Sequence, residues 1–277
     1  MTSELTNRIV DVAGTKINYV EKGEGSPLIL IHGGGPGASG VSNYRKNIDA
    51  FAACHRVIVP DLPGFGLSEN KYEPGAIFTA LSKIIIGLMD VLDIEKADLV
   101  GNSLGGGTSL RAALDHPQRI RKLVLMGPGG SLPAHTPMPT EGLLRMMNFY
   151  RGEGPTMEKV KKVIQLLVFD PSAITESLLE ERLKACMRED VVKAPPLRNG
   201  LGHPDDLLWR QPLENIKQET LLIWGREDRV IPLDCYVPLM KTIPNAQLHV
   251  FPNCGHWAQW EKADEFNELV LNFLARK

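Results

Sequence analysis

The sequence predicts an α/β protein with a mostly parallel sheet and helices on both faces. Short apolar runs recur along the 277 residues, and each ends in turn-forming residues. Apolar runs without alternation are typical of parallel strands that are covered on both sides. Helix-like segments separate these runs, which is the order expected for such a sheet. The expected strands lie within 27–35, 55–64, 97–103, 121–130, 219–228 and 246–256.

One long segment breaks this alternation. Residues 134–210 contain helical patterns, such as "TMEKVKKVIQLLVFD", but no convincing strand, and proline-rich stretches bound them. Because loops at the carboxyl edge of a sheet build active sites, we expect a helical cap at 134–210 over a core made of 1–133 and 211–277. Extra surface helices are the alternative. The other expected helices lie at about 76–93, 104–116, 235–243 and 261–275.

Composition and charge exclude several classes of protein. A formal net charge of -2 gives no reason to expect nucleic acid or an anionic membrane as a partner. The N-terminus lacks the apolar segment of a secretion signal, and no apolar run approaches the roughly 20 residues that span a bilayer. The four cysteines are scattered, so neither a disulfide framework nor a zinc site is expected. We expect a cytoplasmic protein without a metal or other cofactor.

The segment "LVGNSLGGGTSL" holds the first candidate for chemistry. Ser103 stands between Gly101 and Gly105, after an expected strand and before an expected helix. This context is typical of the nucleophile elbow, in which a tight turn exposes a serine hydroxyl. A helix cap is the alternative. A phosphate loop is disfavoured because no Gly-Lys-Ser/Thr follows the glycines.

A serine nucleophile needs a base and an acid that orients the base. Of the seven histidines, His256 in "NCGHWAQWE" follows the last expected strand, where this architecture places the base. The acid is expected between the serine and the histidine in sequence. Asp228 is preferred because it lies deeper in its loop, and Glu227 is the fallback. A surface salt bridge is the alternative role for either carboxylate.

The glycine loop "HGGGPGASG" after the first long strand is a candidate for binding an oxyanion. One backbone N–H is expected from Leu104, directly after the nucleophile, and a second from this loop. His32 could brace the loop. A dinucleotide-binding loop is excluded because Pro36 interrupts the glycines and no G-x-G-x-x-G opens a helix.

Longer segments resemble a known family. "LIHGGGPGASGVSNYRKNIDAF", "KLVLMGPGG", "WGREDRVIPL" and "HVFPNCGHWAQWEKADEFN" are similar to the meta-cleavage product hydrolases, most of all to the biphenyl-pathway type. These are serine-dependent enzymes of the α/β-hydrolase fold, which has an eight-stranded sheet. They cut a carbon–carbon bond in the bacterial breakdown of aromatic compounds. The resemblance covers nearly the whole chain and is weakest in 134–210.

The resemblance implies roles for the candidates. The triad would be Ser103, Asp228 and His256, and the N–H groups of Gly34 and Leu104 would hold the oxyanion. Four residues would lie around the substrate: Gly33, Asn43, Asn102 and Trp257.

Arg182 matches a cap arginine that would hold the carboxylate and enol oxygens of the substrate. Arg188 and Arg198 stay open as alternatives, because the match is looser there. A planar guanidinium binds a carboxylate and an adjacent oxygen together, which a lysine does less well.

The implied substrate is a 2-hydroxy-6-oxo-6-aryl- or alkyl-hexa-2,4-dienoate. No cofactor is needed, and a homo-oligomer is expected by resemblance. An esterase or lactonase on the same triad is the alternative enzyme, and a non-enzymatic binding protein is a third hypothesis. Apolar cap residues such as Met146 and Leu167 could shape the pocket, although plain packing is the commoner use of such residues.

Overall fold

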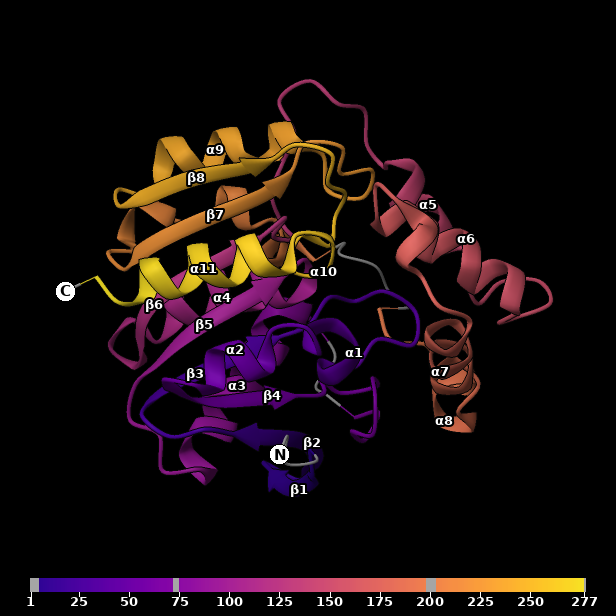
Figure 1. Cartoon of the computed structure of the whole chain (residues 1–277), viewed down its shortest axis with the longest axis horizontal. Coiled ribbons are helices and arrows are strands. Elements are labelled where there is room, and N and C mark those ends of the chain that lie inside the picture. The colour runs from indigo at the N-terminus through magenta and orange to yellow at the C-terminus, as the bar shows by residue number, and fades with distance from the viewer. Residues whose placement is uncertain (1–4, 72–74, 198–202, 277) are drawn as a thin grey trace.

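One sheet organises the described part of the chain. The computed structural model describes residues 5–71, 75–197 and 203–276. These residues form an eight-stranded sheet in the order β1-β2-β4-β3-β5-β6-β7-β8, parallel from β4 to β8 (Figure 1). The predicted fold class is therefore confirmed. The six expected strands are β3 (Ser26–Ile31), β4 (His55–Pro60), β5 (Ala97–Asn102), β6 (Ile120–Met126), β7 (Glu219–Gly225) and β8 (Ala246–Phe251).

The sheet begins with a hairpin that the strand patterns did not predict. β1 (Asn7–Val12) and β2 (Thr15–Lys22) pair antiparallel, and β2 also pairs antiparallel with β4. β1 is mostly exposed, so its sequence lacks the continuous apolar run that marks the buried strands. The turn does carry a signal: Ala13 and Gly14 have φ of 50° and 80°, as a tight two-residue hairpin turn requires.

Helices cover both faces of the sheet. One apolar core includes side chains of α3 (Ile77–Val91), α4 (Leu104–Asp115) and α9 (Tyr236–Thr242). The opposite core includes side chains of α1 (Gly40–Tyr44), α2 (Ile48–Ala52) and α11 (Ala263–Leu274). The predicted helix at 261–275 is in fact preceded by a separate turn, α10 (Ala258–Glu261). The two short helices α1 and α2 were not predicted.

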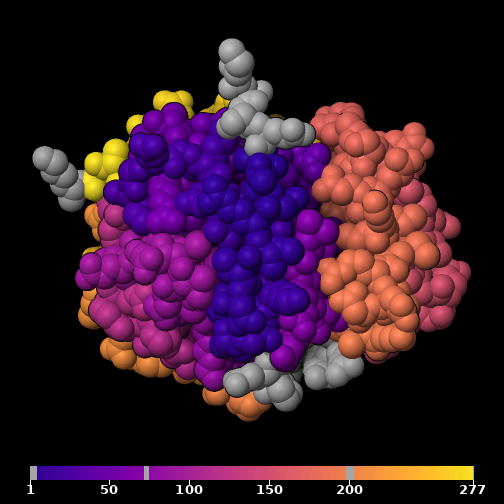
Figure 2. Space-filling view, turned by 90° about the horizontal axis from the view of Figure 1, so that it is seen from below, coloured from indigo at the N-terminus to yellow at the C-terminus, as the bar shows by residue number. Residues whose placement is uncertain are grey.

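The regular elements in the described part of 134–210 are all helices. Side-chain caps explain where three helices begin, because each of Thr140, Thr156 and Thr175 accepts a bond from the N–H three residues later. Figure 1 shows these helices beyond the carboxyl ends of the strands, and Figure 2 shows them as a block on one side of the core. The proposed cap limits stay a prediction. The α-helices are α5 (Glu141–Met147), α6 (Met157–Leu167), α7 (Glu176–Cys186) and α8 (Glu189–Lys193).

Several features are not found among the described residues. None of their helices is both long and apolar enough to cross a bilayer. They contain no cluster of three metal-ligating side chains. All four cysteines are free thiols.

Tyr44 ties α1 to the strands that lead into the site. Its fully buried hydroxyl lies 3.0 Å from the Ile31 carbonyl oxygen and 3.3 Å from that of Val100. We expect Tyr44→Phe to lower the free energy of unfolding by about 1–2 kcal/mol, because a buried carbonyl loses its donor. Urea denaturation would measure this. An unchanged unfolding midpoint would show that the hydroxyl contributes no stability.

Candidate active site

Ser103 occupies the turn between β5 and α4. Its φ of 52° and ψ of -109° are strained for a residue with a side chain. Its N–H donates to the Met126 carbonyl of β6 at 2.8 Å. Neighbouring strands therefore hold the hydroxyl in a turn that the serine would not adopt alone.

The glycines around Ser103 are required by close backbone contacts. A Cβ on Gly101 would lie 2.4 Å from the Gly105 carbonyl oxygen, and a Cβ on Gly105 would lie 2.1 Å from that of Ile31. Both distances are too short for any side chain. The elbow interpretation thus has a structural basis: β3, β5 and α4 meet there backbone to backbone.

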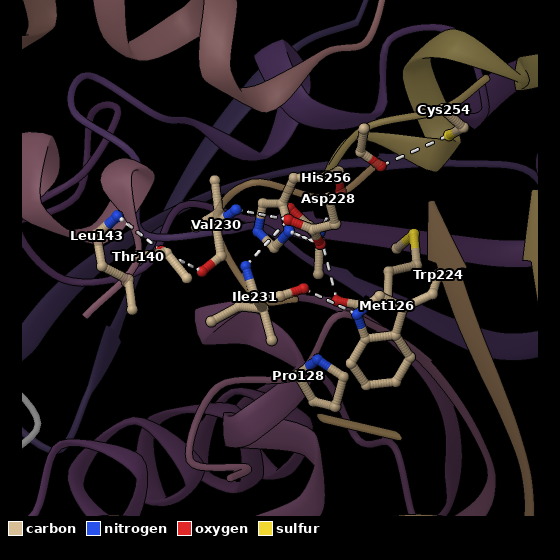
Figure 3. Close-up of polar contacts among 12 residues, drawn as sticks. Met126, Pro128, Thr140, Leu143, Trp224, Asp228, Val230, Ile231, Cys254 and His256 are labelled. Carbon is tan, nitrogen blue, oxygen red and sulfur yellow. Dashed lines mark hydrogen bonds and ion pairs between the residues drawn. The ribbon is translucent and has the colours of Figure 1, made fainter. Parts of the chain in front are cut away.

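His256 and Asp228 form a buried pair. His256 Nδ1 lies 2.6 Å from Asp228 Oδ2 (Figure 3). Asp228 Oδ1 accepts bonds from the N–H groups of Val230 (2.8 Å) and Ile231 (3.0 Å). The acceptor role of the carboxylate places the imidazole proton on Nδ1 and leaves Nε2 as the basic atom. That Nε2 is buried and has no hydrogen-bond partner among the described residues.

The fallback acid has other contacts. Glu227 forms an ion pair with Arg226 (2.7 Å) and accepts from the N–H of Cys254 (3.0 Å). It therefore fits the alternative role of a surface salt bridge, and Asp228 is the carboxylate that contacts His256.

Gly127, which the sequence analysis did not single out, makes room for this pair. Its φ is 44°, and an added Cβ would lie 3.0 Å from His256 Cε1 and 3.2 Å from Asp228 Oδ2. The signal was its place directly after β6, in "LMGPGG". A side chain at this position would push the imidazole or the carboxylate away.

Ser103 and His256 line the same small cavity. The cavity leaves about 10 Å³ for the centre of a water molecule, so it has room for about one water. A larger ligand has to displace side chains. Met146 and Leu167, from the segment 134–210 (the insertion), are among the residues that line the cavity. The other lining residues are Gly33, Gly34, Gly35, Ala38, Asn43, Asn102, Arg182 and Trp257.

Leu104 and Gly34 lie side by side next to Ser103. Leu104 is the first residue of α4, so its N–H has no acceptor within the helix and lies at the positive end of the helix dipole. A Cβ on Gly34 would lie 3.1 Å from Leu104 Cδ2. This pair suits the binding of a developing negative charge.

His32 holds the glycine loop in place. Its Nδ1 donates to the Gly33 carbonyl oxygen (2.8 Å), and its Nε2 accepts from the N–H of Leu62 (2.9 Å). Only a neutral imidazole can do both. Burial lowers the pKa of His32 to about 4, in keeping with that neutral form.

Two buried asparagines connect α1 to the elbow. Asn43 Nδ2 donates to Asn102 Oδ1 at 3.5 Å, and Asn102 Nδ2 lies 3.4 Å from the His256 carbonyl oxygen. These bonds are long, so either amide can exchange them for shorter bonds to a ligand in the cavity.

Arg182 is a fully buried cation on α7. Nη1 donates to the Pro36 carbonyl oxygen (3.3 Å), and the guanidinium carbon lies 4.8 Å from the centre of the Trp257 ring. Its Nε and Nη2 have no partner among the described residues. Burial lowers its pKa to about 10, which leaves it charged at neutral pH.

The alternative arginines differ from Arg182. Arg188 donates to the Gly66 (2.6 Å) and Ser68 (2.9 Å) carbonyl oxygens and forms an ion pair with Asp190. Its guanidinium is therefore already engaged outside the cavity. Arg198 lies outside the described residues.

The described cavity thus combines a hydroxyl, an imidazole, a glycine loop and a buried guanidinium, and Leu104 lies beside the glycine loop. Acyl transfer on an anionic substrate requires these groups. A family model described as the alpha/beta hydrolase family matches residues 28–269. The chain belongs to the α/β hydrolase family.

Similar proteins of known activity narrow the assignment within the α/β hydrolase family. A 2-hydroxy-6-oxo-6-phenylhexa-2,4-dienoate hydrolase from Comamonas testosteroni is 43% identical over 96% of this chain and 94% of the relative. A 2-hydroxy-6-oxononadienedioate/2-hydroxy-6-oxononatrienedioate hydrolase from Burkholderia vietnamiensis is 42% identical over 99% and 96%. The solved meta-cleavage product hydrolase from Pseudomonas fluorescens IP01 is 35% identical over 98% and 97%, with a TM-score of 0.83. The chain is a meta-cleavage product hydrolase, an enzyme that hydrolyses carbon–carbon bonds.

His32 makes the stability of the protein depend on pH. Its folded-state pKa of about 4 lies below the usual 6.5, so the unfolded chain takes up the proton first as the pH falls. The contribution of His32 to the free energy of unfolding is therefore fully present above pH 6.5. It decreases towards pH 4, by up to about 3 kcal/mol. We expect the excess stability of the wild type over His32→Gln to shrink by that order between pH 7 and pH 4 in urea denaturation. Parallel stability curves for the two proteins would contradict this.

Proposed function

We propose that the enzyme hydrolyses the C5–C6 bond of a 2-hydroxy-6-oxohexa-2,4-dienoate with a neutral aryl or alkyl group at C6. Water is added, and the products are 2-hydroxypenta-2,4-dienoate and a carboxylic acid, benzoate where the group is phenyl. The observation that carries the proposal is Arg182, a buried cation with unpartnered nitrogens in the cavity of Ser103 and His256.

Arg182 binds the anionic end of the substrate. A buried guanidinium without a carboxylate partner is costly, and a ligand that supplies two acceptor oxygens satisfies its free N–H groups. The carboxylate and the 2-hydroxyl oxygen of the dienoate are such a pair. Asn43 and Asn102 contact the dienoate chain, and Gly33 lets it approach the backbone.

A proton transfer precedes cleavage. Breaking the C5–C6 bond leaves its electron pair on C5, so the dienol first becomes a ketone, which makes C5 a tolerable leaving group. His256 moves this proton, because its free Nε2 lies in the cavity and Asp228 stabilises the charged imidazole that forms. The cleavage then resembles a reverse Claisen reaction.

Acyl transfer follows at C6. His256 takes the proton of Ser103, whose oxygen attacks the C6 carbonyl, and the N–H groups of Gly34 and Leu104 hold the oxyanion. Departure of the dienoate fragment leaves an acyl-enzyme on Ser103. A water molecule activated by His256 then releases the acid.

The cavity walls support a neutral C6 group. Met146, Leu167 and Trp257 are apolar, and among the described lining residues Arg182 is the cation. A nonadienedioate, as in the name of the Burkholderia relative, carries a second carboxylate that would need a further cation.

A comparison of substrates tests the proposal. We expect fast loss of the yellow colour of 2-hydroxy-6-oxo-6-phenylhexa-2,4-dienoate, at least tenfold slower turnover of the nonadienedioate, and weaker action on p-nitrophenyl acetate. Ser103→Ala is expected to lower kcat by roughly 10⁴-fold or more, because the acyl-enzyme cannot form. Faster turnover of the nonadienedioate would contradict the proposal that the C6 group is neutral. Activity confined to p-nitrophenyl acetate would contradict the proposed carbon–carbon bond cleavage.

Arg182 offers a separate test of substrate binding. We expect Arg182→Gln to lower kcat/KM for the dienoate by roughly 100-fold, about 2.7 kcal/mol, because the carboxylate loses its cation. Arg182→Lys keeps the charge but not the paired donors, so we expect its kcat/KM to lie between those of the wild type and Arg182→Gln. Hydrolysis of p-nitrophenyl acetate, which has no carboxylate, serves as the control. Equal losses on both substrates would show that Arg182 supports the fold instead.

A further inference from the structure

Glu261 joins two segments that lie far apart in the sequence. It is the last residue of α10, five positions after His256. Its Oε2 accepts from the N–H of Gly255 (2.6 Å), directly before His256. Its Oε1 accepts from the N–H groups of Phe169 (2.8 Å) and Asp170 (3.0 Å), which follow α6 in the insertion. One carboxylate therefore holds both the loop of His256 and the end of α6.

The two backbones also touch directly at this point. A Cβ on Gly255 would lie 2.9 Å from the Leu167 carbonyl oxygen and 2.8 Å from the Val168 carbonyl carbon. Trp257 donates its N–H to the same Leu167 oxygen at 3.0 Å. The loop that carries His256 thus lies against the insertion on both sides of the histidine.

We infer that Glu261 is a positioning residue, which fixes the loop of His256 against α6 and so sets the place of the imidazole relative to Ser103. The inference rests on the proposed role of His256 as the base. Asp228 fixes the imidazole from the core, through Nδ1. Glu261 fixes the backbone of the preceding residue, Gly255, and ties it to the segment after α6, the helix that also supplies Leu167 to the cavity wall.

The carboxylate suits this role better than an amide. Three N–H donors share its two oxygens, and bonds to an ionised acceptor are about twice as strong as neutral ones. A glutamine has one carbonyl oxygen and would present its NH₂ group to one set of donors. It can therefore hold the loop or α6, but not both.

The test is Glu261→Gln, which keeps the size of the side chain. We expect kcat for the dienoate to fall about tenfold while KM changes by less than about threefold, because a small displacement of the base lowers the rate more than binding. In a His256→Ala background the same change should alter the residual rate by less than about twofold. The reason is that substitutions at residues that act through one another have non-additive effects on the rate.

Glu181→Gln is the matched control. Glu181 on α7 pairs with Arg45, at the end of α1, at 2.5 Å, so it joins the insertion to the core at a different place from the loop of His256. We expect its kcat to stay near that of the wild type. A full kcat in Glu261→Gln, an equal loss in the control, or an equal loss in the His256→Ala background would overturn the inference.

The outcomes separate this inference from the proposed function. If the wild type does not cleave the dienoate, the proposed function fails, and the same variants are compared on p-nitrophenyl acetate, which also needs Ser103 and His256. If Glu261→Gln does not fold, hydrogen exchange of the backbone amides in the wild type tests the inference instead. We expect Gly255, Phe169 and Asp170 to share one level of protection, whereas exchange of Phe169 and Asp170 at the rate of a free peptide would overturn the inference.

Discussion

The site depends on the buried bond between His256 and Asp228. A carboxylate taken out of water is stable only when its oxygens are satisfied, and here the imidazole and the N–H groups of Val230 and Ile231 do this. The bond fixes one tautomer of His256, which lines the cavity, and leaves Nε2 without a partner among the described residues. Gly127 is part of the same constraint, because a side chain at this position would press on the pair and displace it.

Much of this arrangement could be predicted from the sequence because strand ends are strongly marked. Ser103, Asp228 and His256 each follow a parallel strand with an apolar sequence, and the carboxyl ends of parallel strands meet at one edge. Chain order and the glycines of the elbow then identified the serine. The choice of Asp228 over Glu227 rested on loop depth, and the structure shows Asp228 beside the imidazole.

Other features could not be predicted from the sequence, for physical reasons. β1 is largely exposed and lacks an apolar run, and α1 and α2 are too short for a helical period to show. The role of Gly127 depends on a contact across the sheet, which spacing along the chain does not encode. The link from Glu261 to Phe169 joins residues 92 positions apart through backbone N–H groups, which are the same for every residue type except proline.

The small volume of the cavity has a consequence for the reaction cycle. A space that holds about one water cannot admit a dienoate or release its fragments without movement of the surrounding walls. In the proposed mechanism the two products leave at different stages, so the walls open more than once in each turnover. Opening and closing thereby become steps of the cycle in their own right, and whichever is slower than chemistry sets the speed of the enzyme.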